Sequence, residues 1–233
     1  MDEKHLSLRL EKASAYVPKN GRLADIGSDH AYLPCALVYR NEIAFAIAGE
    51  IVTGPFITAQ EQVKRLGYQE KIDVRLGNGL AVIKLEDNIN ALTICGMGGA
   101  LIASILEDGY QDGKLTGRER LILQPNIGEE PLRKWLMNHQ YEIIGEELLE
   151  EDEKMYEIII AEKSQSAVSY TQAQLTFGLH LREKFPTLFK QKWQRQLIKE
   201  QSILASLKTA TKDQTEKVQI FETKIAEIER LLK

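Results

Sequence analysis

The chain has 233 residues, 43% hydrophobic and 27% charged, which suffices for one α/β domain with a buried core and a smaller second module. No segment is long and apolar enough to span a bilayer, and the charged N-terminal sequence lacks a signal-type apolar core, so we expect a cytoplasmic protein. The two cysteines and four histidines follow no disulfide or metal-ligand spacing, and we expect no structural metal.

The net charge of −4 is distributed unevenly along the chain. Residues 1–163 carry 18 Lys and Arg against 27 Asp and Glu, a net of −9, whereas residues 164–233 carry 12 against 7, a net of +5. A basic segment attached to an acidic one suggests an anionic partner, with nucleic acid as the leading candidate. A solvated helical face is the simpler alternative.

Short apolar runs alternate with segments of helical period between residues 22 and 163, which is the pattern of parallel β-α-β units. We expect strands at 22–27, 45–50, 72–77, 91–97, 120–125, 141–151 and 155–163. We expect helices at 31–40, 53–67, 98–109 and 128–139. Because only "DEK" separates the last two strands, they must pair as an antiparallel hairpin. Five β/α steps followed by such a hairpin predict the α/β, seven-stranded sheet of class I (Rossmann-like) methyltransferases, whereas a dinucleotide dehydrogenase would continue with parallel units.

The strand pattern disappears beyond Lys163, and residues 164–185 predict a helix that begins after a Ser-rich start and that Pro186 interrupts. Apolar residues then recur with coiled-coil spacing. The heptad series is Leu197, Leu204, Thr211, Val218, Ile225 and Leu232, with Leu207, Phe221 and Ile228 three positions later. The polar stretch "KTATKDQTEK" and a capping arrangement of Asp213 with Glu216 favour two helices folded into an antiparallel hairpin over one long rod.

We therefore expect two domains, an α/β domain over 1–163 and a helical coiled-coil domain over 164–233. The folded-back arrangement favours a monomer, and dimerisation through a continuous helix is the alternative.

The stretch "ADIGSDHAYLP" (24–34) has the form of a nucleotide-binding turn, but Asp29 stands where the dinucleotide fingerprint has its second glycine. A carboxylate there would repel a phosphate and its Cβ would obstruct close approach, which disfavours NAD. S-adenosylmethionine carries a net positive charge and no phosphate, so acidic residues favour it. Asp25 can attract its ammonium directly or through water, and Gly27 leaves room for its methionine moiety.

Polar residues also close the neighbouring strands. Glu50 ends the second strand about twenty residues past the turn, where an acidic side chain reaches ribose hydroxyls in this class of fold. Asn78 in "LGNGL" can contact an adenine amino group, with an ordinary Asn-Gly turn as the alternative. The "CGMGG" segment follows the fourth strand and faces the transferred methyl in this architecture; Met97 packs there against a base or in the core.

Taken together, "LSLRL", "LADIGSDHAYLP", "AGE", "GNGL", "GMGG" and "LILQPN" resemble the bacterial tRNA (adenine-22, N(1))-methyltransferase family over residues 6–163. The helical tail matches that family's coiled-coil appendage more loosely. The resemblance implies methyl transfer from S-adenosylmethionine to ring nitrogen N(1) of an adenine in the D-arm region of tRNA. It implies a cofactor site made by Asp25, Gly27, His30, Glu50, Asn78, Gly79 and Gly96, with Arg9 at the pocket mouth in contact with the cofactor carboxylate or the tRNA backbone. It also implies that Asp29, Met97, Gln124 and Asn126 border the target base.

The sequence lacks the Asn-Pro-Pro-Tyr signature of many enzymes that methylate an exocyclic adenine amine, which fits a ring-nitrogen target. N(1) already has an in-plane lone pair, so alignment with the methyl is the main requirement. Asp29 is the candidate for stabilising the positive charge that the adenine acquires. Alternatively, Asp29 caps the helix that begins near Ala31.

The tail carries a basic and aromatic cluster suited to phosphates and exposed bases. Its members are Lys184, Lys190, Lys192 and Arg195 around Phe185, Phe189 and Trp193. We expect Lys190, Lys192 and Arg195 to contact tRNA, whereas the aromatics fit packing onto the first domain better than base stacking. Two other functions stay open. One is a non-catalytic cofactor-binding scaffold that recruits partners through the coiled coil. The other is a small-molecule methyltransferase, in which the basic tail would have no function.

Overall fold

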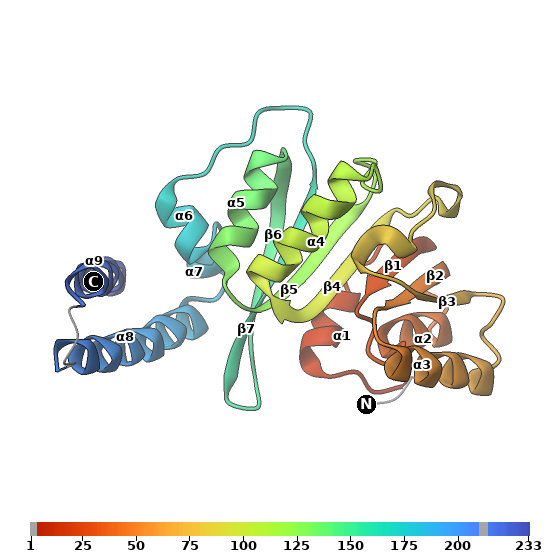
Figure 1. Ribbon diagram of the computed structural model, residues 1–233, viewed down its shortest axis with the longest axis horizontal. Helices are drawn as coiled ribbons and strands as arrows, with labels where there is room; N and C mark the ends of the chain where they lie inside the picture. Colours follow the sequence, from red (N-terminus) through yellow and green to blue (C-terminus); the bar gives the residue numbers. More distant parts are fainter. Residues whose placement is uncertain (1–3, 210–213) are drawn as a thin grey trace. The chain divides into compact units, whose positions relative to one another are not determined.

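The computed structural model describes residues 4–209 and 214–233 and contains a seven-stranded sheet in the order β3-β2-β1-β4-β5-β7-β6 (Figure 1). The strands are β1 (Gly21–Ile26), β2 (Ile43–Glu50), β3 (Ile72–Leu76), β4 (Ala91–Gly98), β5 (Arg120–Ile127), β6 (Tyr141–Glu151) and β7 (Lys154–Lys163). The first five are parallel, and β7 runs antiparallel to both β5 and β6. The predicted sheet and terminal hairpin are confirmed. The strand order reverses between β1 and β4, and ligands bind at such switch points.

Helices cover both faces of the sheet and bury two apolar layers. One face carries α1 (Leu8–Ser14), α2 (Tyr32–Tyr39) and α3 (Thr53–Leu66), and the other carries α4 (Gly99–Gln111) and α5 (Glu129–Asn138). The central parallel strands contribute side chains to both layers, which explains their continuous apolar sequences. The sequence analysis missed the short helix α1. Ser7 caps its N-terminus, because the Ser7 side chain accepts a hydrogen bond from the Leu10 N–H.

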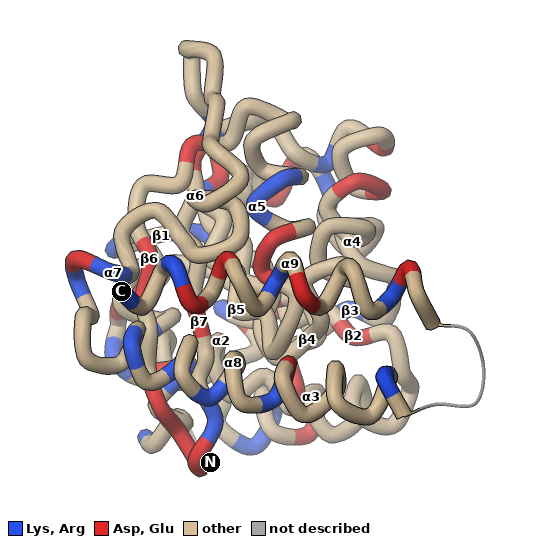
Figure 2. The backbone as a smooth tube through the Cα atoms, turned by 90° about the vertical axis from the view of Figure 1, so that its left-hand side faces the viewer, with Lys and Arg blue, Asp and Glu red and all other residues tan. Residues whose placement is uncertain are grey.

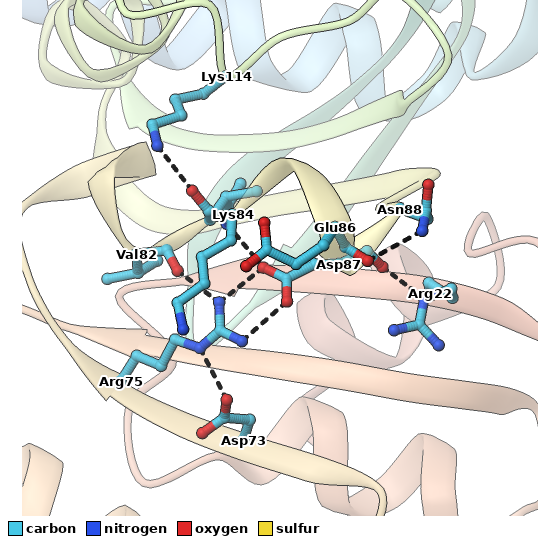
Figure 3. A network of polar contacts seen from close by, with 10 residues as sticks. Arg22, Asp73, Arg75, Val82, Lys84, Glu86, Asp87, Asn88 and Lys114 are labelled. Atoms are coloured by element: carbon cyan, nitrogen blue, oxygen red, sulfur yellow. Dashed lines mark hydrogen bonds and ion pairs between the residues drawn. The ribbon is translucent and has the colours of Figure 1, made fainter.

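A polar network fixes the segment between β3 and β4, which contains the short 3₁₀ helices η1 (Gly79–Val82) and η2 (Leu85–Asp87) (Figure 3). Arg75 on β3 donates to both carboxylate oxygens of Asp87 at 2.6 and 2.8 Å and to the Val82 carbonyl at 2.8 Å. Such bidentate pairing restrains geometry as well as charge. The segment that begins with Asn78 is thereby held at the carboxyl edge of β3.

The first compact unit of the chain extends to His180, beyond the expected boundary at residue 163. A buried ion cluster explains this extension: Arg133 on α5 donates to Glu146 on β6 at 2.6 and 2.9 Å and pairs with Glu157 on β7. Arg133 also donates to the Leu175 carbonyl at 3.3 Å. Glu146 accepts the backbone N–H groups of residues 179 and 180 at 2.7 and 2.8 Å, so residues up to 180 are fastened to the sheet.

The continuous helix expected between the Ser-rich start of this segment and Pro186 is wrong, because Gly178 divides it into α6 (Gln172–Phe177) and a second short helix. Residues 164–171 are not helical, and α6 begins with a capping box between Thr171 and Gln174. Gly178, with φ of 89°, ends it.

The second unit, Leu181–Lys233, contains α7 (Leu181–Lys184), α8 (Pro186–Lys208) and α9 (Thr215–Leu232). Ion pairs between α8 and α9 join Lys208 to Glu222 at 2.6 Å and Glu200 to Lys224 at 2.5 Å, which fixes an antiparallel hairpin as predicted. The described heptad residues are at least partly buried, and Ile225 and Ile228 are fully buried. Thr211 and Asp213, which the sequence analysis used, lie outside the described residues. None of the described helices is both long and apolar enough to cross a membrane.

Candidate active site

Asp25 lies at the end of β1, at the switch point, and its side chain is buried. Its carboxylate accepts hydrogen bonds from Ser28 Oγ at 2.5 Å and from Thr93 Oγ1 at 2.6 Å. Burial raises the pKa of Asp25 to about 6, although these two hydrogen bonds oppose the shift. The carboxylate therefore titrates close to neutral pH and gains from any cation placed beside it.

The loop after β1 adopts an unusual backbone conformation. Three successive residues that are not glycine, Asp29, His30 and Ala31, have φ of 43°, 63° and 58°. Left-handed conformations of this kind cost free energy and cluster at functional sites. Ala31 is the residue before α2, and no side chain caps that helix. The alternative that Asp29 caps α2 is therefore wrong: the N-cap residue is Ala31, and the side chain of Asp29 is 65% exposed.

Glu50 and His30 carry the unpartnered polar atoms of this loop. Glu50 at the end of β2 accepts a hydrogen bond from the Asp29 backbone N–H. Its Oε1 atom is buried and has no hydrogen-bond partner among the described residues, and the same is true of His30 Nδ1. Burial raises the pKa of Glu50, and the carboxylates of Asp25 and Asp29 raise it further. The site thus presents three neighbouring carboxylates and a buried acceptor that awaits a donor, which fits a cationic ligand with hydroxyl groups and opposes a phosphate.

Met97 is on β4, and its side chain lies next to Gly27 in the loop after β1, at the switch point. A Cβ placed on Gly27, whose φ is +68°, would lie 2.3 Å from Met97 Cε. Any side chain at position 27 would therefore displace the methionine. The structure brings Gly27 and Met97 together, as the expected site requires.

The "QPN" segment at the end of β5 holds the Gly96 loop, the irregular end of β4 at which the pairing with β5 shifts register. Gln124 is fully buried, and its Oε1 accepts the Gly96 N–H at 3.0 Å and Arg9 Nη1 at 3.2 Å. Its Nε2 donates to Asn126 Oδ1 at 3.2 Å, and Asn126 Nδ2 donates to the Gly96 carbonyl at 2.7 Å. The N–H and the carbonyl of Gly96 are thus both held by hydrogen bonds, and its backbone is left-handed, with φ of +79°.

Arg9 on α1 is held within the protein by several groups. Its Nε lies 3.7 Å from Glu151 Oε2, and its guanidinium lies 5.6 Å from the centre of the Tyr156 ring. With the Gln124 hydrogen bond, these contacts attach α1 to the Gly96 loop.

The other expected residues occupy two separate places. Asn78 and Gly79 lie at the carboxyl end of β3, and Asn78 is exposed just before η1. Lys190, Lys192 and Arg195 lie on α8 of the second unit, which carries five basic residues and one acidic residue, whereas α9 carries three and four (Figure 2). The tail's positive charge is therefore concentrated on α8. Phe189 and Trp193 on the same helix are buried, which opposes base stacking by these two rings.

Sequence reasoning missed Ser28 and Thr93, the two hydroxyl donors to Asp25. Ser28 follows the "DIG" of the turn, so a hydroxyl three residues after the aspartate was an available signal. Thr93 lies on the neighbouring β4 opposite Asp25, and only the strand order identifies it.

Comparisons with known proteins agree on one family. A family model described as tRNA (adenine(22)-N(1))-methyltransferase, TrmK, matches residues 23–230. The tRNA (adenine(22)-N(1))-methyltransferase of Bacillus subtilis is 44% identical over 226 residues, which cover 95% of this chain and 94% of that protein. An uncharacterized protein from Listeria monocytogenes has a similar structure, with 46% identity, a TM-score of 0.92 and coverage of 98% and 100%. Streptococcus pneumoniae Sp1610, solved in complex with S-adenosyl-L-methionine, shows 43% identity, a TM-score of 0.88 and coverage of 98% and 100%.

Proposed function

This chain belongs to the tRNA (adenine(22)-N(1))-methyltransferase family, and from that premise we propose which of its residues bind the cofactor, the adenine and the tRNA. The enzyme transfers a methyl group from S-adenosylmethionine to N(1) of adenine 22 in tRNA. S-adenosylmethionine supplies an electrophilic methyl on a sulfonium, and the protein supplies binding, alignment and electrostatics.

The acidic loop at the switch point holds the cofactor. The single observation that carries this assignment is the buried, unpartnered Oε1 of Glu50, because a ribose hydroxyl is the donor it lacks. Asp25 attracts the cationic amino-acid end, and Gly27 with His30 forms the adjoining wall. Asn78 and Gly79 at the end of β3 border the adenine ring of the cofactor.

Asp29 and Met97 border the adenine that is methylated. The side chain of Asp29 is 65% exposed and lies 3.5 Å from His30 Nε2, so its carboxylate is accessible to a substrate. As N(1) bonds to carbon it gains positive charge, and a nearby carboxylate stabilises that charge or accepts a hydrogen bond from the amino group. Met97, seated on Gly27, provides an apolar surface at the carboxyl edge of β4.

Gln124 and Arg9 are positioning residues. Every hydrogen bond of the buried Gln124 amide goes to the protein itself, so it orients the Gly96 loop without contacting the base. Asn126 completes the clamp and is exposed, which leaves it able to contact substrate as well. Arg9 supports the same loop from α1.

The basic helix α8 contacts the tRNA backbone through Lys190, Lys192 and Arg195, because phosphate contacts position a nucleic acid without reading its sequence. The described heptad side chains are partly or wholly buried, and ion pairs join the two helices of the hairpin, which supports a monomer. A cytoplasmic location is part of the same proposal, since the enzyme must meet tRNA.

Incubation with unmodified tRNA and labelled S-adenosylmethionine, followed by nucleoside analysis, tests the reaction. We expect 1-methyladenosine at position 22. Label that appears only on a small molecule or on the protein itself would contradict the function, and tRNA that binds without gaining a methyl would identify a scaffold.

The role of α8 is tested by replacing Lys190, Lys192 and Arg195 together with glutamine. We expect the KM for tRNA to rise and the slope of log affinity against log salt to fall by about one per lost phosphate contact. Glutamine at Lys64, Arg65 and Lys71 provides a control triplet of equal charge loss. Equal effects of the two triplets would remove α8 from the interface.

A further inference from the structure

Ile127, the last residue of β5, is 73% exposed, more than any other large hydrophobic side chain in the described part of the chain. Leu101 in the first turn of α4 is 54% exposed. Single exposed apolar side chains are common on protein surfaces, so the place of Ile127 in the fold, and not its exposure alone, carries the argument.

The backbone that carries Ile127 is closely packed against neighbouring backbone. Ile127 pairs with Gly98 in the ladder between β4 and β5. The next residue, Gly128, crosses the start of α4 so closely that a Cβ on Gly99 would lie 1.9 Å from its carbonyl oxygen. Glycine is therefore required at position 99, and the crossing fixes where Ile127 projects. Ile127 directly precedes Gly128 on one of the two crossing segments, and Leu101 follows Gly99 by two residues on the other.

This place adjoins the methyl-transfer site. Gly98, the strand partner of Ile127, directly follows Met97, which lies over Gly27. Asn126, directly before Ile127, holds the carbonyl of Gly96 at 2.7 Å. Ile127 thus lies at the carboxyl end of β5, beside the position expected for the target adenine.

The local charge favours contact with bases over contact with phosphates. Glu129 and Glu130 begin α5 immediately after Gly128 and would repel a phosphate group. An apolar side chain can instead enter a base stack, as aliphatic wedges do in proteins that unstack nucleic acids. Unstacking is required here, because a base must leave its stack to reach a buried reaction centre.

We propose that Ile127, flanked by Leu101, is a wedge that enters the base stack beside adenine 22 and holds that adenine in the active site. The inference rests on the proposed function and adds a positioning residue to it. The wedge takes the place that the adenine vacates, so it acts on the equilibrium between the stacked and extruded base.

The test uses the full-length enzyme and tRNA with 2-aminopurine at position 22, whose fluorescence rises when the base leaves its stack. We expect wild type to raise the fluorescence on binding and Ile127→Ala to give less than about half of that rise. On unmodified tRNA, Ile127→Ala should lower kcat/KM about tenfold, and Ile127→Leu should restore most of it. The dissociation constant for S-adenosylmethionine should stay unchanged.

Leu85→Ala is the matched control, because Leu85 on η2 is 64% exposed and precedes β4 at the opposite edge of the sheet. It should behave as wild type in both assays. A full fluorescence rise together with wild-type kcat/KM in Ile127→Ala would overturn the proposal. A loss of S-adenosylmethionine affinity as large as the loss of kcat/KM would also overturn it, because Ile127 would then be a cofactor contact. If wild type itself forms no 1-methyladenosine, the proposed function fails, and the wedge is judged separately by the fluorescence measurement.

Discussion

At the scale of single residues, the aspartate that replaces a glycine of the dinucleotide fingerprint changes the ligand class. Asp29 belongs to a group of three carboxylates with Asp25 and Glu50, and two of these have raised pKa values. Like charges gathered without a cation are unfavourable, so a positive ligand relieves the repulsion. The three carboxylates therefore repel one another in the free protein and attract a cationic ligand once it binds.

The pKa of Asp25, about 6 in the free protein, predicts pH-dependent cofactor binding. The ionised form attracts the cationic ligand, so affinity should fall as the pH drops through 6. Between pH 7 and pH 5 the ionised fraction falls about tenfold, and the dissociation constant should rise by a similar factor. Asp25→Asn should bind more weakly at pH 7 and lose most of this dependence, as titration calorimetry would show. An unchanged pH profile in the variant would assign the dependence to other groups, of which Glu50 is the nearest.

Asp29→Asn keeps the size of the side chain and removes its charge. We expect kcat for tRNA to fall about a hundredfold, because a stabilising charge in the transition state is lost, while the dissociation constant of S-adenosylmethionine changes only a few-fold. Single-turnover kinetics and equilibrium binding measure the two effects. Asp112→Asn, at the exposed end of α4, is the control. Wild-type single-turnover rates in Asp29→Asn would exclude the proposed role.

At the scale of elements, the site depends on contacts between segments far apart in the chain. The "QPN" segment of β5 clamps Gly96 near the end of β4, and Arg9 on α1 joins the same network. The Arg133 cluster likewise connects α5, β6, β7 and the chain before α7. These contacts make the terminal β-hairpin part of the support for the catalytic edge.

Arg133→Met tests the buried cluster. Loss of the guanidinium leaves Glu146 and Glu157 buried without their cation, and such losses cost about 3–5 kcal/mol. Urea denaturation should show this decrease in the free energy of unfolding, whereas Arg118→Met on the exposed loop before β5 should change it little. A decrease below about 1 kcal/mol would mean that the cluster does not stabilise the fold.

At the scale of the whole molecule, the structure moves the place where the chain can be divided. A fragment of residues 1–180 keeps Leu175 and the two N–H groups that Glu146 binds, whereas a fragment of residues 1–163 loses them. We expect the longer fragment to fold and to bind S-adenosylmethionine within a few-fold of wild type but to methylate tRNA at least about a hundredfold more slowly, because phosphate contacts are lost. The shorter fragment should unfold at a lower temperature. Full tRNA activity in residues 1–180 would remove the helical hairpin from substrate binding.

The sequence alone determined the sheet, its terminal hairpin and the folded-back tail. These follow from local periodicity and from connection length: a three-residue link allows only an antiparallel return, and a heptad pattern interrupted by polar residues favours a turn. The acidic character of the turn was also readable, because charge at one position of a known turn needs no tertiary information.

Only the tertiary structure decided how the site residues act. Gln124 was expected to border the target base, and the structure shows that it is fully buried and accepts a hydrogen bond from the Gly96 N–H. Asp29 was a possible helix cap until the backbone placed it in a left-handed run. Thr93 reaches Asp25 because the sheet puts β4 beside β1. Hydrogen-bond partners across strands depend on register and on which side chains are buried, and no local pattern in a single sequence encodes either.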